Sequence, residues 1–178
     1  AGAGALAGVM LRETNYRGAR RAMLGVKPSG ALEWHTRSSV SGANTLTAGG
    51  TAVFPVWLKL ERNGDTLTAF RAADTAGAPG AWTPVGAALT LAALAPAVDF
   101  GLAATNAVLN TTVVAGFDQV TLSPAGTALV DEDLGVPGTA GSTAVNGSSY
   151  TLSASGTLGD SGRFRYQQFV GDVTITAG

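Results

Sequence analysis

Cysteine is absent from the 178 residues, which excludes a disulfide framework, a thiolate nucleophile and a cysteine-based metal site. Charged residues make up only 13% of the chain, and the formal net charge is −1. We therefore expect no nucleic-acid partner. Long apolar runs are also missing, because the most apolar window, residues 86–98, contains Pro96 and is too short to span a bilayer. We expect no membrane insertion.

What is present favours β-structure. The chain has 25 glycines and abundant alanine and threonine, but only two methionines, which disfavours a helical bundle. Short segments alternate apolar and polar residues, and Gly, Asn, Asp and Ser separate them. The clearest pair flanks Asn63-Gly64, a dipeptide that suits a type I′ hairpin turn. About twelve such segments and no convincing helix predict an all-β fold of two packed antiparallel sheets.

The best internal boundary follows Leu122, where Ser-Pro-Ala-Gly reads as a turn or linker. It divides the chain into residues 1–124, the main part of a sandwich, and residues 125–178. The second part has about fifty residues, which is short for an independent sandwich. We expect it to share a core with other strands.

Several segments of residues 1–124 form a recognisable pattern through their order and spacing along the chain. They are A-G-V-M-L-R-E at 7–13, W-L-K-L-E-R-N-G at 57–64, the Asp74 and G-A-W…V-G element at 80–86, F-G-L-A at 100–103 and A-G-F-D-Q-V at 115–120. Together they resemble the concanavalin A-like jelly-roll modules that occur in tandem in large secreted bacterial proteins. The resemblance implies a two-sheet antiparallel jelly-roll β-sandwich.

The order of the parts departs from that family. The segments at 133–135, 151–156, 163–166 and 171–177 resemble the opening strands of such a module, yet here they follow the closing strands. The chain is then a circular permutant, an out-of-phase piece of a tandem array, or a subunit that lends strands to a neighbour. Unpaired strands are templates for another chain. We expect residues 127–178 to pair with another copy.

Candidate sites are few. A glycan site on a sandwich needs exposed aromatics with planar polar partners, and the best exposed pair is Tyr16 with Arg17, in the turn after the first strand. Trp34 and Trp82 are expected to pack inside. The candidate ion is structural calcium, for which the acidic candidates are Asp99, Asp118, Asp131 and Asp133. No catalytic cofactor is expected.

Catalytic patterns are weak. No E-x-D-x-x-E string of the kind used by glucanases of this superfamily occurs. Asp131-Glu132-Asp133 reads as a solvated acidic turn. His35 shares a strand face with Glu33 and Arg37, which favours a surface ion-pair ladder over general-base chemistry.

The sequence as a whole favours a non-catalytic structural subunit or repeat of a bacterial surface filament or sheath. Such a protein would be secreted, and its partners would be further copies, joined by strand sharing or tandem linkage. The alternative is a carbohydrate-binding or adhesion module of a secreted protein, with polysaccharide as its partner.

Overall fold

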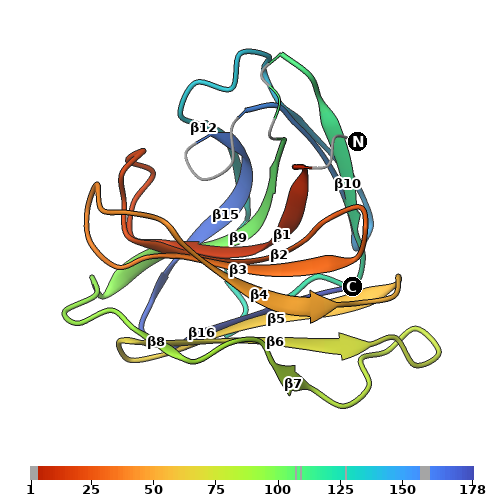
Figure 1. Cartoon of the computed structure of the whole chain (residues 1–178), viewed down its shortest axis with the longest axis horizontal. Coiled ribbons are helices and arrows are strands. Elements are labelled where there is room, and N and C mark those ends of the chain that lie inside the picture. Colours follow the sequence, from red (N-terminus) through yellow and green to blue (C-terminus); the bar gives the residue numbers. More distant parts are fainter. Residues whose placement is uncertain (1–3, 107, 109, 127, 157–160) are drawn as a thin grey trace.

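The computed structural model describes residues 4–106, 108, 110–126, 128–156 and 161–178, and their regular elements are all β-strands (Figure 1). The strands form three antiparallel sheets of seven, six and three members. This confirms the predicted all-β, antiparallel class. Among the described residues there is no helix with the length and apolarity needed to cross a membrane.

The seven-stranded sheet forms one layer of the molecule. Its strands, in spatial order, are β12 (Val130–Leu134), β15 (Gly162–Val170), β9 (Ala97–Thr105), β1 (Leu6–Arg12), β2 (Arg21–Val26), β3 (Ala31–Arg37) and β4 (Thr45–Thr51). Side chains alternate between its two faces. On β1, Val9 and Leu11 belong to the main core, whereas Met10 lies in a smaller apolar cluster. We call the face that carries Met10 the outer face of this sheet.

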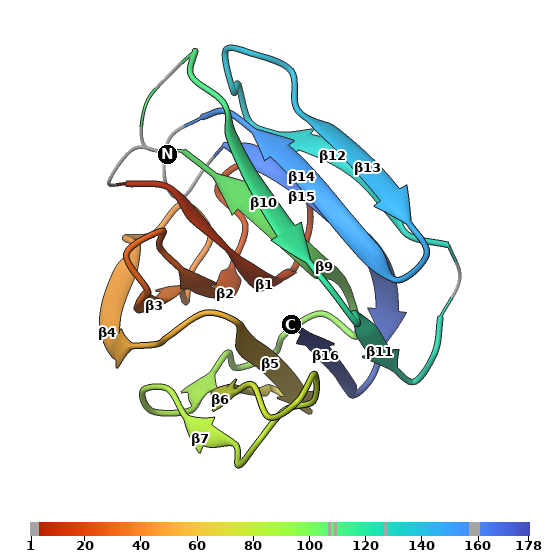
Figure 2. The same cartoon turned by 90° about the vertical axis from the view of Figure 1, so that its right-hand side faces the viewer.

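The other two sheets form the second layer (Figure 2). The six-stranded sheet consists of β11 (Thr121–Ser123), β16 (Val173–Ala177), β5 (Val56–Asn63), β6 (Thr66–Ala73) and β7 (Thr83–Pro84), with β8 (Leu89–Thr90) also paired to β6. The three-stranded sheet has the order β10 (Val113–Phe117), β14 (Ser149–Ala154) and β13 (Ser142–Asn146). The hairpin predicted at Asn63-Gly64 joins β5 to β6, and Gly64 has a φ of 59°.

The main core lies between the two layers. Trp34, which is 3% exposed, packs there as predicted, together with Leu11, Phe100, Leu60 and Ile175. The smaller cluster on the outer face centres on Met10, Met23 and Phe164. The architecture is therefore β-sandwich-like, with loops covering one outer face.

The C-terminal part packs on its own chain. Strand β15 pairs with β9 over eight residue pairs and with β12 on its other side, β16 pairs with β5 and β11, and β14 pairs with β10. This corrects the expectation that the strands of residues 127–178 complete another copy; Thr127 itself lies outside the described residues. The close approach depends on Gly101, where a Cβ atom would lie 2.0 Å from the carbonyl oxygen of Arg165.

Candidate functional site

Three arginines stand side by side on the outer face of the seven-stranded sheet. Arg12 is opposite Arg21 on the next strand, and Arg21 is opposite Arg37 on the one after. On its other side Arg12 is opposite Asp99. All four residues are at most 5% exposed. Buried charges are costly unless they are paired or hydrogen-bonded, so the partners of this row determine what the face can do.

The first partner is the loop between β1 and β2. Arg12 donates hydrogen bonds from Nε to the carbonyl oxygen of Thr14, at 3.4 Å, and from Nη2 to that of Tyr16, at 2.8 Å. At the base of the same loop Arg20 pairs with Glu13, and this hydrogen bond lowers the pKa of the Glu13 carboxyl group. The buried Arg12 guanidinium group therefore holds two carbonyl groups of the loop, and the Glu13–Arg20 pair joins the residues at its base.

The other two arginines also bind loops. Arg37 donates to the carbonyl oxygens of Arg17, at 3.0 Å, and Gly42, at 3.1 Å. Arg21 donates to the side-chain oxygen of Asn44 at 2.8 Å. The β1–β2 loop and the β3–β4 loop are thus joined to one sheet face through guanidinium groups, whose several donors suit this role.

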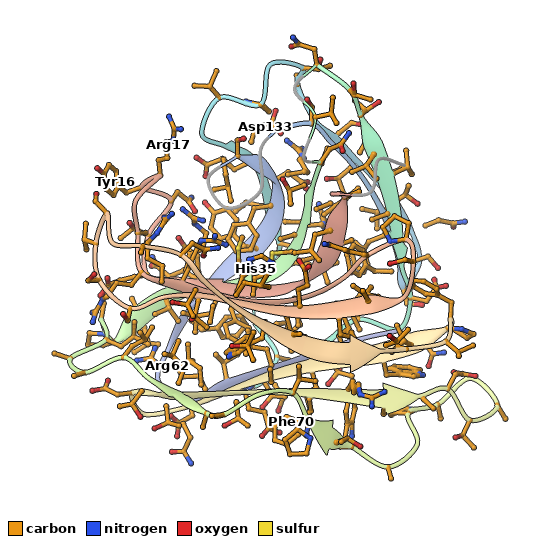
Figure 3. The ribbon with its side chains drawn as sticks, viewed as in Figure 1. Tyr16, Arg17, His35, Arg62, Phe70 and Asp133 are labelled. Atoms are coloured by element: carbon orange, nitrogen blue, oxygen red, sulfur yellow. The ribbon has the colours of Figure 1, made fainter. Side chains whose placement is uncertain are left out.

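Tyr16 and Arg17, the predicted glycan pair, lie at the tip of the β1–β2 loop. Both side chains are exposed, Tyr16 by 59%, and both point away from the sheet (Figure 3). The Tyr16 hydroxyl lies 3.4 Å from Oγ of Ser41 in the neighbouring loop. The structure thus brings together an exposed aromatic ring and a guanidinium group on a loop whose carbonyl groups are anchored. Sites on well-supported backbone need less ordering on binding.

Glu132 is a site residue that sequence reasoning missed. It lies on β12 and accepts hydrogen bonds from Nδ2 of Asn15 and, at 3.1 Å, from the Tyr166 hydroxyl. Burial and the nearby charge of Glu132 raise the pKa of Asp99 to about 6. Strand alternation places Glu132 on the outer face, away from Asp131 and Asp133, but its approach to Asp99 is visible only once the strand order β12-β15-β9 is known.

Two groups of this cluster, the Asp99 carboxyl and the Tyr166 phenol, have shifted pKa values. The pKa of Asp99 is about 6, and burial raises the pKa of the Tyr166 phenol. Such shifts occur at functional sites and also in structural ion-pair networks. The loops that cover this face give the cluster the character of a structural network.

Two of the four candidate calcium ligands are already paired. Asp131 and Asp133 lie within β12, not in a turn, which corrects the interpretation of this run as a solvated turn. Nη1 of Arg163 lies 3.2 Å from Asp133, and Arg165 pairs with Asp131. Arg165 also lies over the Tyr150 ring at 5.2 Å, so these ion pairs connect β12 and β15 to the three-stranded sheet.

The remaining two candidates lie elsewhere. Asp99 is on the outer face, and Asp118 follows β10, where its backbone pairs with Gly178. Within the described ranges, no group of three or more His, Asp or Glu side chains is arranged to hold a metal ion. The four carboxylates do not converge on one site. Calcium binding by a smaller set stays a prediction.

His35 lies on the outer face beneath the loops (Figure 3). Its Nε2 lies 2.8 Å from the Glu33 carboxylate, and its Nδ1 lies 3.1 Å from the Asn44 amide nitrogen. The expected contact with Glu33 is present, but the residue is only 3% exposed, which corrects the expectation of a surface ladder. Burial lowers the pKa of His35.

A cluster of aromatic side chains lies on the outside of the six-stranded sheet. Nζ of Lys59 lies 4.4 Å from the centre of the Phe70 ring and 4.8 Å from that of Trp82. Trp57 donates from its ring nitrogen to Asp74 at 2.9 Å. Lys59 thus contacts both rings. Trp82 lies half-buried on the outside of this sheet, which corrects the expectation that it packs inside.

Comparison with protein-family models, with curated proteins and with solved structures finds no match. The resemblance to concanavalin A-like modules therefore stays a prediction that rests on the sequence segments quoted above. At the level of architecture, the chain is an antiparallel, β-sandwich-like all-β protein.

Proposed function

We propose that this chain is a non-catalytic structural subunit or repeat of an extracellular bacterial assembly, built as a concanavalin A-like jelly roll and associating with further copies of itself. The two-layer antiparallel architecture supports the jelly roll. The observation that carries the proposal of self-association is the contrast between the edges of the sheets.

Most proteins protect an edge strand by charge, proline or shortness. Strand β12, one edge of the seven-stranded sheet, carries three consecutive acidic residues. Strand β7, an edge of the six-stranded sheet, has two residues, one of them Pro84. These edges are poor templates for a second chain.

Strand β4 differs from them. Its seven residues, T-L-T-A-G-G-T, contain no charge and no proline, and nearly all are exposed. It ends the sheet, and its pairing with β3 is regular from Thr45 to Ala48, before a bulge bends the second half. Leu46 is 53% exposed on this edge. Two copies pairing through β4 would meet no like-charge repulsion.

The test is the size of the purified chain at increasing concentration, measured by light scattering and electron microscopy. We expect larger species to grow with concentration. Leu46→Lys, which places a charge on the edge, should shift growth to higher concentration. Val136→Lys is the matched control, because Val136 is 74% exposed but lies outside the strands. A chain that stays monomeric throughout would rule the proposal out.

A second function is favoured by the anchored tip of the β1–β2 loop, which presents Tyr16 and Arg17 to solvent. We propose glycan binding there as the alternative. A glycan array would show saturable binding that Tyr16→Ala abolishes without changing the melting temperature. Absence of saturable binding would leave the structural role alone.

A further inference from the structure

The partners of His35 fix which of its two ring nitrogens carries a hydrogen. The residue is 3% exposed and lies on the outer face of the seven-stranded sheet (Figure 3). Its Nε2 lies 2.8 Å from a carboxylate oxygen of Glu33, and its Nδ1 lies 3.1 Å from Nδ2 of Asn44. A carboxylate only accepts hydrogen bonds, so Nε2 must carry the hydrogen. In the neutral ring, Nδ1 therefore has a lone pair that accepts from Asn44.

Arg21 fixes the orientation of the Asn44 amide. Its Nη2 donates to Oδ1 of Asn44 at 2.8 Å. A guanidinium group has only donors, so the oxygen of this amide must face Arg21 and the nitrogen must face His35. A flipped amide would set its NH2 group against the guanidinium group. Rotation of the Asn44 amide therefore cannot satisfy Arg21 and a donor at Nδ1 of His35 at the same time.

This fit fails once the His35 ring takes up a second proton. That proton binds Nδ1, where the new N–H group faces the NH2 group of Asn44, which is also a donor. The Nε2–H group keeps its acceptor, and the Glu33 carboxylate stabilises the positive charge of the ring. A buried donor without an acceptor is costly. The ring therefore stays on Glu33, and Asn44 is the partner that must move.

The charged groups around His35 keep the ring neutral until the solution is acidic. On the strands beside it they are Glu33 and Arg37 on β3, Arg21 on β2 and Lys27 just after β2, whereas Arg17 in the covering β1–β2 loop points away. The neighbouring strand β4, T-L-T-A-G-G-T, contains no charged residue. Burial lowers the pKa of His35, Arg21 and Lys27 act in the same direction, and Glu33 opposes them.

Asn44 lies where the β3–β4 loop enters β4. The next residue, Thr45, is the first of the strand. The middle of the loop has a separate anchor, because Arg37 donates to the carbonyl oxygen of Gly42 at 3.1 Å. Loss of the Asn44 contact should therefore loosen the start of β4 and leave the rest of the loop attached.

We propose that His35 is a pH-sensitive switch for the start of β4. The neutral ring accepts from Asn44 and holds the end of the loop against the sheet, whereas the protonated ring releases Asn44. The switch goes beyond the proposed function and does not depend on it. Because β4 is also the edge that we assign to self-association, the switch makes the order of that edge depend on pH.

Nuclear magnetic resonance on the dilute wild-type chain tests the switch without any variant. His35 is the only histidine, so its ring signals are unambiguous. The ring nitrogens should show hydrogen on Nε2 alone at neutral pH. In acid, the contact between the ring and the Asn44 amide protons should disappear with the midpoint of the ring's titration, and backbone order at Thr45 should decrease. Hydrogen on Nδ1 at neutral pH, titration without loss of the Asn44 contact, or a ring that stays neutral until the chain unfolds would overturn the proposal.

Asn44→Asp reverses the chemistry, because a carboxylate accepts from both Arg21 and the protonated ring. It should raise the proton affinity of His35 at least about tenfold and keep Thr45 ordered in acid. Asn146→Asp makes the same change at the exposed end of β13, in another sheet, and should alter that affinity by less than about twofold. An affinity that rises no more in Asn44→Asp than in Asn146→Asp rejects the switch. A chain that does not self-associate rejects the proposed function and leaves these titrations unaffected.

Discussion

The outer face of the seven-stranded sheet and the apolar groove between β10 and the start of β5 differ in how far the described residues cover them. The face carries Arg12, Arg21, Arg37 and Asp99, and the chain's own loops cover it until each residue is at most 5% exposed. The groove is lined mainly by apolar side chains, and the apolar residues on its rim are more than half exposed. The chain's own loops cover the charged face, whereas the described residues leave the apolar groove partly exposed.

The difference follows from what each surface needs. A guanidinium group needs a few carbonyl oxygens, and Arg12 finds one only four residues away, at Tyr16. An open strand edge needs a row of N–H and C=O groups at strand spacing, and only another strand offers that. A short loop therefore suffices to cover the first surface, whereas only a further strand has the groups to cover the second.

The largest expected effect comes from a disulfide that tests whether β9 and β15 of the seven-stranded sheet pair within one chain. Ala97 and Val170 are opposite each other at the end of the β9–β15 pairing, next to the hydrogen bond from Gly171 to Pro96. Such a non-hydrogen-bonded pair has Cα atoms about 4.5 Å apart, which suits a disulfide. Ala97→Cys with Val170→Cys should form an intramolecular bond and stabilise the chain by about 4 kcal/mol.

The readout is non-reducing electrophoresis, together with urea unfolding with and without reductant. The chain has no cysteine of its own, so each engineered single-cysteine variant is a clean control. Covalent dimers or ladders in place of a compact monomer would show that β15 pairs in another copy.

The next effect concerns the buried arginine row. Arg12→Met should cost about 3 kcal/mol of the free energy of unfolding, because Tyr16 and Thr14 lose a charged donor and Asp99 loses a neighbouring cation. Arg17→Met, at the exposed loop tip, is the matched control and should change it by less than about 0.5 kcal/mol. Urea unfolding measures both. Equal costs would show that the row does not close this face.

The smallest effect concerns the pH dependence of the same face. The pKa of Asp99 is about 6 in the folded chain, above its ordinary value, because of burial and of Glu132. Between pH 4 and 6 the folded state therefore binds more protons than the unfolded state, and Asp99 lowers stability as pH rises through this window.

Asp99→Asn should flatten the fall in stability over that window, measured by urea unfolding at several pH values. Arg12, Glu132 and Tyr166 are the neighbouring charged and titratable groups and stay in place. Glu61→Gln removes one carboxylate from the far layer and controls for the change in net charge. An unchanged profile in Asp99→Asn would remove this carboxyl group from the pH response.

Local chemistry made part of the structure predictable. Alternation of period two indicated the all-β class and placed Trp34 in the core. The Asn63-Gly64 dipeptide indicated the β5–β6 hairpin, and the polar turn after the first strand indicated that Tyr16 and Arg17 are exposed. Each of these features depends on residues close together in the chain.

Pairing between distant segments was beyond such reasoning. Whether β15 joins its own β9 and whether Glu132 approaches Asp99 both depend on strand order and register. The same alternating strand fits any compatible edge, in its own chain or in another. The sequence by itself therefore determined the all-β class, the β5–β6 hairpin and the inward face of Trp34, whereas tertiary packing decided which distant strands pair and which charged face the chain's own loops cover.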